Sequence, residues 1–239
     1  MKVGILAAGT SPDELADRHG TYADMVCALL QRAGMDAEFS VYEVRNDDFP
    51  DTVECCDAWV ITGSRHNVDE GMPWIGRLER MVPEILAAGQ PLAGICFGHQ
   101  LIAQALGGRV ERFSGGWGLG LQEYALLDSA HLETEGRRSF RINAIHQYQV
   151  VEKPASADVF ATSESCRFAG LLYGEQVITL QAHPEFSSDF ERELLVLRKS
   201  SAFPDEAASR ALAALDQCPV DTDSDQVGQW LAQVLCRAA

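Results

Sequence analysis

The first half of the chain alternates short apolar runs with amphipathic stretches. Four segments predict strands, at residues 2–8, 37–44, 58–62 and 91–95, and the first and the third of these strands are expected to be buried. Between these runs, apolar residues recur at helical spacing at residues 22–30, 74–85 and 101–106. Gly34 is well placed to end the first helix, and Pro73 is well placed to open the second. Strands that alternate with helices in this way predict right-handed βαβ units and a mainly parallel sheet.

From about residue 109 the pattern changes to successive strands. The candidates are residues 122–127, 141–145, 168–173 and 176–183, and the last two form a hairpin through Gly174-Glu175. The last fifty residues are predicted to be helical, with one helix opening at Pro204 and a final one carrying an apolar stripe that includes Trp230. We expect these helices to pack on the sheet edge of their own chain, and a partner or dimer surface is the alternative.

Composition narrows the class of protein. The 239 residues are 46% hydrophobic and 23% charged, the balance of a globular chain with a sizeable core. The first apolar run is too short for a signal peptide, and no run approaches the roughly 20 residues that cross a bilayer, so we expect a cytoplasmic protein and no membrane partner. The net charge of −16 argues against binding nucleic acid. The seven scattered cysteines show no zinc-binding spacing and are expected to be reduced, and no metal or cofactor is predicted.

One cysteine lies in a pattern that indicates catalysis. Gly94-Ile95-Cys96-Phe97-Gly98 has the form of a nucleophile elbow, in which a sharp strand-to-helix turn exposes the nucleophile above the sheet. An apolar strand precedes the motif and an amphipathic helix follows it, as the elbow requires. The helix N-terminus favours the thiolate form of Cys96, and the backbone N–H of Phe97 is free to point at an oxyanion.

A cysteine nucleophile needs a base, and the base needs a group that orients it. His183 follows an apolar strand at the end where open α/β sheets place their sites, and Glu185 lies within reach of its imidazole. His99 is the rival base, one helical turn after Cys96, but it has no adjacent carboxylate, so helix capping or packing is the favoured role. Cys96, His183 and Glu185 are therefore the predicted catalytic triad.

The segment Pro91-Leu92-Ala93-Gly94-Ile95-Cys96-Phe97-Gly98-His99-Gln100 and the triplet His183-Pro184-Glu185 together resemble the class I glutamine amidotransferases. The likeness extends to the amidotransferase domain of GMP synthase and to plant γ-glutamyl peptidases. It implies a flavodoxin-like three-layer sandwich over residues 1–190, with residues 191–239 as a helical extension packed on the same domain. It also implies attack on a γ-glutamyl amide, a γ-glutamyl thioester on Cys96, release of ammonia or an amine, and hydrolysis.

The same resemblance implies roles for other positions. Gly63 and Ser64 stand where the family has a Gly-Gly pair that supplies a second oxyanion N–H, and Gln100 matches a position that helps to hold the substrate. Ile145-His146-Gln147-Tyr148 aligns with a Ser-His-x-Asp loop that cradles the α-amino and α-carboxylate groups of glutamine, which makes His146, Gln147 and Tyr148 candidate substrate-binding residues. Only the histidine of that loop is kept. Trp117, on a loop that borders the family's pocket, is assigned either a stacking role or core packing.

Two enzymatic functions remain open at this point. The first is a glutamine amidotransferase that passes ammonia to an acceptor. For that function either a separate synthase partner or no synthase partner must be supposed, because the fifty residues after 190 are too few for an ATP-using domain. The second is a γ-glutamyl peptidase or hydrolase with water as acceptor, which the altered loop at residues 145–148 favours. A non-catalytic metabolite-binding scaffold is a third alternative, and the complete triad argues against it. The fold of DJ-1-type proteins also has a Cys elbow, but there a histidine commonly follows the cysteine, whereas Phe97 follows it here.

Overall fold

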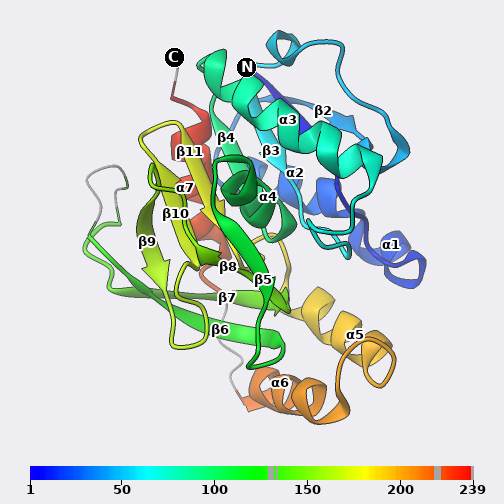
Figure 1. The fold of residues 1–239 in the computed structure, drawn as a ribbon. Coiled ribbons are helices and arrows are strands. Elements are labelled where there is room, and N and C mark those ends of the chain that lie inside the picture. Colours follow the sequence, from blue (N-terminus) through cyan, green and yellow to red (C-terminus); the bar gives the residue numbers. More distant parts are fainter. Residues whose placement is uncertain (129–131, 133, 218–221, 238–239) are drawn as a thin grey trace.

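The computed structural model describes residues 1–128, 132, 134–217 and 222–237, and these form a flavodoxin-like sandwich of helices around one large sheet (Figure 1). The strands of the amino-terminal half are β1 (Lys2–Leu6), β2 (Glu38–Tyr42), β3 (Ala58–Ile61) and β4 (Leu92–Ile95). The helices between and after them are α1 (Asp13–His19), α2 (Tyr22–Arg32), α3 (Pro73–Ala87) and α4 (Phe97–Ala105). Two short 3-10 turns, η1 (Val44–Asn46) and η2 (Val53–Cys55), connect β2 to β3.

The second half supplies seven strands and three helices within the described residues. The strands are β5 (Arg109–Arg112), β6 (Gly118–Leu126), β7 (Ser139–His146), β8 (Tyr148–Glu152), β9 (Asp158–Thr162), β10 (Gly170–Tyr173) and β11 (Val177–Leu180). The helices are α5 (Ser188–Arg198), α6 (Asp205–Gln217) and α7 (Ser224–Leu235). The large sheet has the order β2-β1-β3-β4-β11-β10-β9-β6-β7, and β5 and β8 form a separate antiparallel pair.

The sheet has a parallel half and an antiparallel half. β2, β1, β3, β4 and β11 pair in parallel, which confirms the predicted mainly parallel core. β10, β9, β6 and β7 continue the sheet in antiparallel pairs, and β10 and β11 form the predicted hairpin with Gly174 at a φ of 58°. The strands β5, β8 and β9 and the helix α1 were not predicted, because short half-exposed segments carry little periodicity in their sequences.

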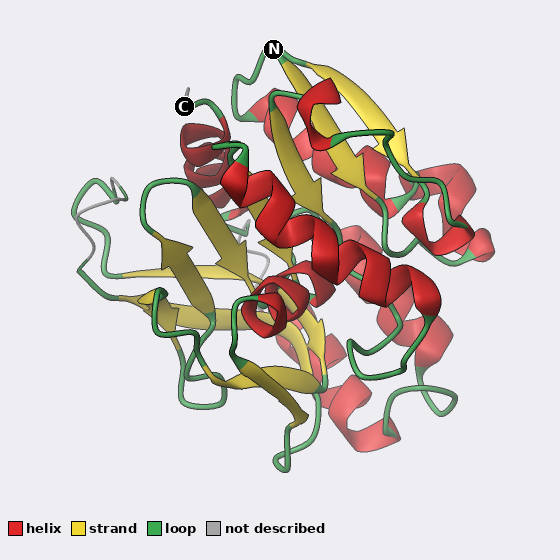
Figure 2. Cartoon of the chain, turned by 45° about the horizontal axis from the view of Figure 1, so that its top comes forward, coloured by secondary structure: helices red, strands yellow, loops and turns green. Residues whose placement is uncertain are grey.

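Helices cover both faces of the parallel strands, and α3 and α4 lie together on one of them (Figure 2). The stripe predicted for the second helix is buried there in full, as Trp74, Ile75, Leu78, Met81, Val82 and Ile85. On the opposite face, α2 and α7 pack side by side over the central strands. No helix within the described ranges is long and apolar enough to cross a membrane.

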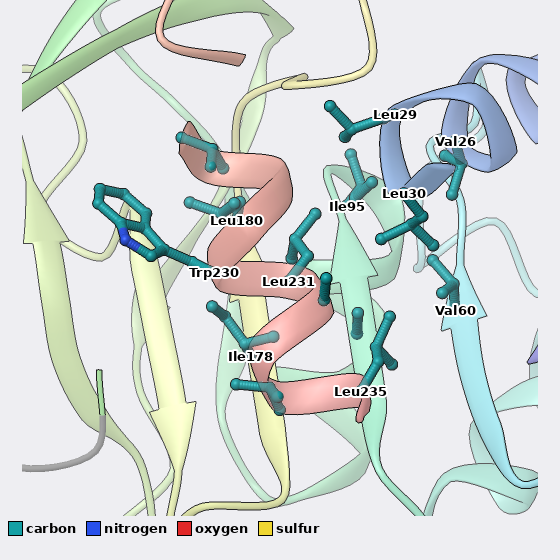
Figure 3. Close-up of a cluster of buried hydrophobic side chains, with 14 of the residues drawn as sticks. Val26, Leu29, Leu30, Val60, Ile95, Ile178, Leu180, Trp230, Leu231 and Leu235 are labelled. Carbon is teal, nitrogen blue, oxygen red and sulfur yellow. The ribbon is translucent and has the colours of Figure 1, made fainter. Parts of the chain in front are cut away.

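The position of α7 corrects one prediction. The helix does not lie at the sheet edge but on the face of the sheet, where Leu231 and Leu235 meet Ile95 of β4 and the side chains of α2 (Figure 3). Trp230 is 1% exposed and packs edge-to-face against Phe140 at 5.4 Å between ring centroids. Burial of a tryptophan ring contributes on the order of 3 kcal/mol, so α7 is part of the main core. Helix α6, by contrast, packs on β6 near the antiparallel edge of the sheet.

The boundary between a domain at 1–190 and an extension at 191–239 stays a prediction. Helix α5 runs across that boundary from Ser188 to Arg198, and its buried face packs Phe190 and Leu194 against Leu15 of α1 and Phe186. The chain on either side of residue 190 is therefore continuous in packing as well as in sequence.

Candidate active site

Cys96 occupies the turn between β4 and α4, at φ 52° and ψ −100°. A positive φ is rare for a residue with a side chain, so this turn stores backbone strain that the surrounding packing must hold. The flanking glycines allow that packing. A Cβ at Gly94 would lie 2.6 Å from Cδ1 of Ile102, and a Cβ at Gly98 would overlap the carbonyl oxygen of Ile61. The spacing Gly-x-Cys-x-Gly therefore lets α4 dock closely on β3 and β4.

The sulfur of Cys96 is buried among polar groups. It lies 3.7 Å from the carbonyl oxygen of Ile145 and 3.8 Å from Nε2 of Gln181. Gln181 in turn accepts a hydrogen bond from Nε2 of Gln100 at 3.2 Å, and the same Nε2 donates to the carbonyl oxygen of Tyr148 at 2.8 Å. Sequence reasoning missed Gln181. A polar residue directly after the apolar run of β11 was the available signal, because a buried amide needs partners.

His183 lies three residues beyond the end of β11, and hydrogen bonds and stacking hold its ring. Its backbone N–H donates to the carbonyl oxygen of Asn143 at 2.8 Å, which ties the turn to β7. Its Nδ1 lies 2.7 Å from Oε1 of Glu185, and both side chains are at most 5% exposed. The ring stacks on Phe186 with centroids 4.1 Å apart and planes 5° from parallel. These contacts leave Nε2 as the nitrogen not engaged by the carboxylate.

Charge decides the protonation of His183. Burial by itself lowers the pKa of the imidazole, but the negative charges of Glu185 and of the Cys96 thiolate outweigh it and raise the pKa well above its usual value. A hydrogen bond with Cys96 acts in the same direction. The site therefore favours the charged imidazolium form of His183.

The loop after β3 touches both groups. A Cβ added at Gly63 would lie 2.7 Å from Cε1 of His183 and 3.7 Å from Cβ of Cys96, so the glycine leaves room for the imidazole. Thr62 holds the loop, because its hydroxyl accepts from the Ala8 N–H at 3.0 Å and donates to the Gly63 carbonyl at 3.1 Å. Phe97 begins α4, where the first backbone N–H groups have no acceptor within the helix. The oxyanion role assigned to these N–H groups stays a prediction.

A cavity of about 770 Å³ opens over Cys96. Most of the residues predicted for the site line it: Ser64, Cys96, Phe97, Gln100, His146, Gln147, Tyr148 and His183. Gly63 and Glu185 are not among the lining residues, and Glu185 lies buried behind His183. Trp117 lines the cavity and packs edge-on against Phe203 at 4.9 Å, and a stacking role toward a ligand stays a prediction.

Several segments of the cavity wall were not predicted, among them residues 8–11, Tyr22, Arg45 and residues 65–67. Pro12, Asp13 and Glu14 come from the start of α1, Leu194 and Arg198 from the end of α5, and Ala202 and Phe203 from the loop that follows. The last two segments belong to the part of the chain that was predicted to be an extension. Charges in the wall are the side chains of Asp13, Glu14, Arg45, Arg65 and Arg198.

Two further histidines near the site are neutral. Burial, and then the charge of His183, lower the pKa of His146 to about 4, against a smaller opposing effect of the Tyr148 backbone. Burial, and then His146, lower the pKa of His99 to about 3. Nδ1 of His99 shares a 2.8 Å hydrogen bond with the Thr179 hydroxyl on β11, which gives His99 a packing position in the interior. Within the described ranges, no group of three or more histidine, cysteine or acidic side chains is arranged to hold a metal ion.

Comparison with known proteins places these features in a family. Residues 17–199 match the model of the family described as glutamine amidotransferase class-I. A glutamine amidotransferase-like protein of Schizosaccharomyces pombe is 30% identical over 238 residues, covering 92% of this chain and 94% of that protein. γ-Glutamyl peptidase 3 of Arabidopsis thaliana is 29% identical, covering 79% of this chain and 82% of that protein. One of the subunits of the glutamine-hydrolysing GMP synthase of Methanopyrus kandleri is also 29% identical, covering 72% of this chain and 87% of that protein.

The fold has a counterpart among solved structures as well. The crystal structure of a glutamine amidotransferase from Thermotoga maritima superposes with a TM-score of 0.72 at 20% identity, covering 98% of this chain and 96% of that one. The resemblance inferred from the two motifs is thus confirmed, and so is the flavodoxin-like fold that it implied.

Proposed function

The chain belongs to the class I glutamine amidotransferase family, and we propose that it is a cysteine hydrolase that cleaves a γ-glutamyl amide through a thioester on Cys96. One observation carries the proposal. Cys96, a strained and buried cysteine at a helix N-terminus, shares a cavity with His183, and Nδ1 of His183 is 2.7 Å from the buried carboxylate of Glu185. The three groups have the roles that acyl transfer needs, which are nucleophile, base and orienting group.

The reaction begins with the thiolate. His183 takes the proton of Cys96, and Glu185 stabilises the imidazolium and holds Nδ1, so that Nε2 faces the reacting groups. The sulfur attacks the γ-carbonyl carbon of the substrate and forms a C–S bond. The carbonyl oxygen becomes an oxyanion, for which the N–H of Phe97 and an N–H of the Gly63-Ser64 loop are the proposed donors.

Collapse of this intermediate breaks the C–N bond. His183 returns its proton to the leaving nitrogen, and ammonia or an amine departs, leaving the γ-glutamyl thioester. His183 then takes a proton from water, whose oxygen attacks the thioester carbonyl and releases glutamate and the Cys96 thiol. General acid–base catalysis of this kind typically contributes about 10²- to 10⁴-fold to a rate.

The proposed substrate-binding residues lie along the same cavity. Gln100 is buried and donates to the Tyr148 carbonyl and to Gln181, so its amide is fixed next to the nucleophile. His146 is neutral and mostly buried, and it borders the cavity. Gln147 and Tyr148 complete this side of the wall.

Two activities would use this chemistry. A γ-glutamyl peptidase activity is favoured by the size of the cavity, because about 770 Å³ lies within the range that holds drug-sized ligands and exceeds what glutamine alone requires. Ile145 and Tyr148, in place of the family's serine and aspartate, also favour a substrate other than free glutamine. The second candidate is a glutaminase that delivers ammonia to a separate synthase, as the name of the Methanopyrus kandleri relative suggests.

The test is a comparison of substrates on the purified protein. Release of glutamate is measured from glutamine and from γ-glutamyl dipeptides, and the acyl-enzyme is sought by mass spectrometry of the Cys96 peptide. Turnover of γ-glutamyl dipeptides but not of glutamine selects the peptidase. Turnover of glutamine alone selects the glutaminase. Cys96→Ala should lower the rate of either activity by several orders of magnitude. If Cys96→Ala keeps the activity, or if no γ-glutamyl compound is turned over, the proposal is wrong.

A further inference from the structure

An arginine from the carboxy-terminal part of the chain lies in the wall of the catalytic cavity. Arg198 is the last residue of α5, and its side chain is partly buried. Leu194, one helical turn earlier, lines the same cavity, so this face of α5 is directed at the site. Partial burial of a guanidinium costs free energy unless an anion or several acceptors meet it.

The backbone around Arg198 is firmly held. Its carbonyl oxygen accepts from the N–H groups of Ser201, Ala202 and Phe203, at 3.2, 2.9 and 3.1 Å. These bonds close a tight loop after the helix and fix the position from which the side chain leaves. The side chain itself has neither an ion pair nor a hydrogen bond to any described residue. A side chain whose backbone is held in place and whose guanidinium has no partner is suited to binding an anion.

The other two arginines of the cavity differ from Arg198. Both are exposed, and both have acidic neighbours. Nε of Arg45 donates to Oε2 of Glu43 at 2.9 Å, and the charge of Arg65 acts on Glu70. Their charges are therefore screened by water and offset by carboxylates. Arg198 is the one cation of the described cavity wall that is partly buried and lacks a partner.

The charges of Arg198 and of Cys96 both act on the pKa of Tyr22. Burial raises the pKa of the Tyr22 hydroxyl, the charges of Glu185 and Cys96 raise it further, and the charge of Arg198 acts the other way. The hydroxyl is thus within electrostatic reach of both Cys96 and Arg198. Cys96, Tyr22 and Arg198 line the same cavity, so a γ-glutamyl group bound at Cys96 shares that cavity with both of the other side chains.

We propose that Arg198 binds a carboxylate of the substrate and so selects γ-glutamyl compounds that carry one at the right distance from the scissile amide. The inference rests on the proposed function, since it names the group that this site recognises. Two carboxylates could meet Arg198: the α-carboxylate of the γ-glutamyl group, or a carboxylate on the leaving amine. Both call for the same bidentate guanidinium chemistry.

Four substrates separate the two sources. γ-Glutamylglycine carries both carboxylates. Its glycinamide form lacks the one on the leaving group, its α-carboxamide form lacks the one on the glutamyl group, and the doubly amidated form lacks both. The wild type is compared with Arg198→Gln, with Arg198→Lys, which keeps the charge, and with Arg192→Gln. Arg192 is on the same helix but pairs with Asp216 on the surface, so its replacement controls for a change in α5.

We expect Arg198→Gln to raise KM for γ-glutamylglycine by about 10- to 100-fold, because one charge-assisted hydrogen-bonded pair is lost. The carboxylate is bound alike in ground state and transition state, so kcat should change little. Arg198→Lys should recover part of the loss, and Arg192→Gln should match the wild type. If amidation of one of the two substrate carboxylates makes KM independent of Arg198→Gln, that carboxylate is the one that Arg198 binds. An equal loss on all four substrates, or no loss on any, would overturn the inference.

Failure of the inference can be told apart from failure of the proposed function. Binding of the same compounds is measured by calorimetry on proteins that carry Cys96→Ala, with and without Arg198→Gln. Turnover without any dependence on Arg198 refutes the arginine's role and leaves the hydrolase intact. Carboxylate-dependent binding without turnover supports the role of Arg198 and refutes the hydrolase.

Discussion

The contact between Gly63 and His183 predicts the effect of a single added methyl group. The φ of Gly63 is not in the positive range, so alanine can adopt its backbone conformation. The new Cβ would nevertheless lie 2.7 Å from Cε1 of His183, whereas ordinary van der Waals contact begins near 3.4 Å. The imidazole must therefore shift by at least about 0.7 Å, or the loop after β3 must move by as much.

Neither shift is easy. Stacking on Phe186 and the 2.7 Å contact with Glu185 hold the imidazole, and the two hydrogen bonds of the Thr62 hydroxyl hold the loop. A displacement near 1 Å in a catalytic group can cost about 100-fold in rate, which corresponds to about 2.7 kcal/mol in the activation free energy. We therefore expect Gly63→Ala to lower kcat/KM by about 100-fold, with the fold retained.

The assay needs two readouts and one control. The first readout is the turnover of γ-glutamyl substrates. The second is the rate at which iodoacetamide alkylates Cys96, measured on the isolated Cys96 peptide, because this rate reports thiolate formation in the absence of substrate. Gly76→Ala is the matched control, because an added Cβ at this position inside α3 meets only the flexible guanidinium of Arg80, at 3.6 Å. It should raise stability by roughly 0.5–1 kcal/mol and leave turnover unchanged. If Gly63→Ala stays within about threefold of the wild type in both readouts, the argument from a tightly held imidazole is wrong.

Three more substitutions test the charges around the site. Glu185→Gln should lower kcat by about 10²- to 10⁴-fold and slow alkylation of Cys96 near neutral pH, because the imidazolium of His183 loses its counter-charge; unchanged alkylation would contradict this. His99, whose pKa of about 3 keeps it neutral when folded, should cost the wild type about 1.4 kcal/mol of stability per pH unit as pH falls below about 6.5. Urea unfolding at pH 6 and pH 5 should show that cost reduced in His99→Gln, which keeps an amide for Thr179. Glu191 is fully buried and its pKa is raised to about 8, so its side chain keeps its proton in the folded protein but ionises near pH 4.5 in the unfolded chain. The stability gained by Glu191→Gln should therefore be absent at pH 4.5 and should grow up to about pH 8. A stability difference that is constant with pH would refute the assignment.

The chain's local patterns predicted the layers of the fold but only part of the sheet. The buried strands β1, β3 and β4 and the helices α2 and α3 were predicted because continuous apolar runs and 3.6-residue stripes need only a few neighbouring residues to be recognised. Strand β6 begins at Gly118, earlier than expected, because it gains its order from pairing with β7 rather than from its own composition.

The candidate site divides in the same way. Cys96, His183 and Glu185 could be selected from the sequence because an elbow and a His-Pro-Glu triplet are local patterns, each built by one turn of the chain. Gln181 gave only the weak signal of a polar residue after an apolar run, and Arg198 gave no signal, since Gln181 is distinguished by a partner far along the chain and Arg198 by the absence of a partner. Gln181 meets Gln100 at a separation of 81 residues, and Arg198 reaches the cavity only because α5 packs against α1.

By itself, the sequence therefore determined the class of fold, the family and the residues that we propose for the chemistry, because each of these is encoded in short stretches of residues. Tertiary structure alone decided that α7 lies on the face of the sheet and that α1 and the end of α5 complete the cavity wall. It also decided which charges in that wall are already paired. These outcomes depend on burial and on contacts between distant segments, and such quantities exist only once the chain has packed.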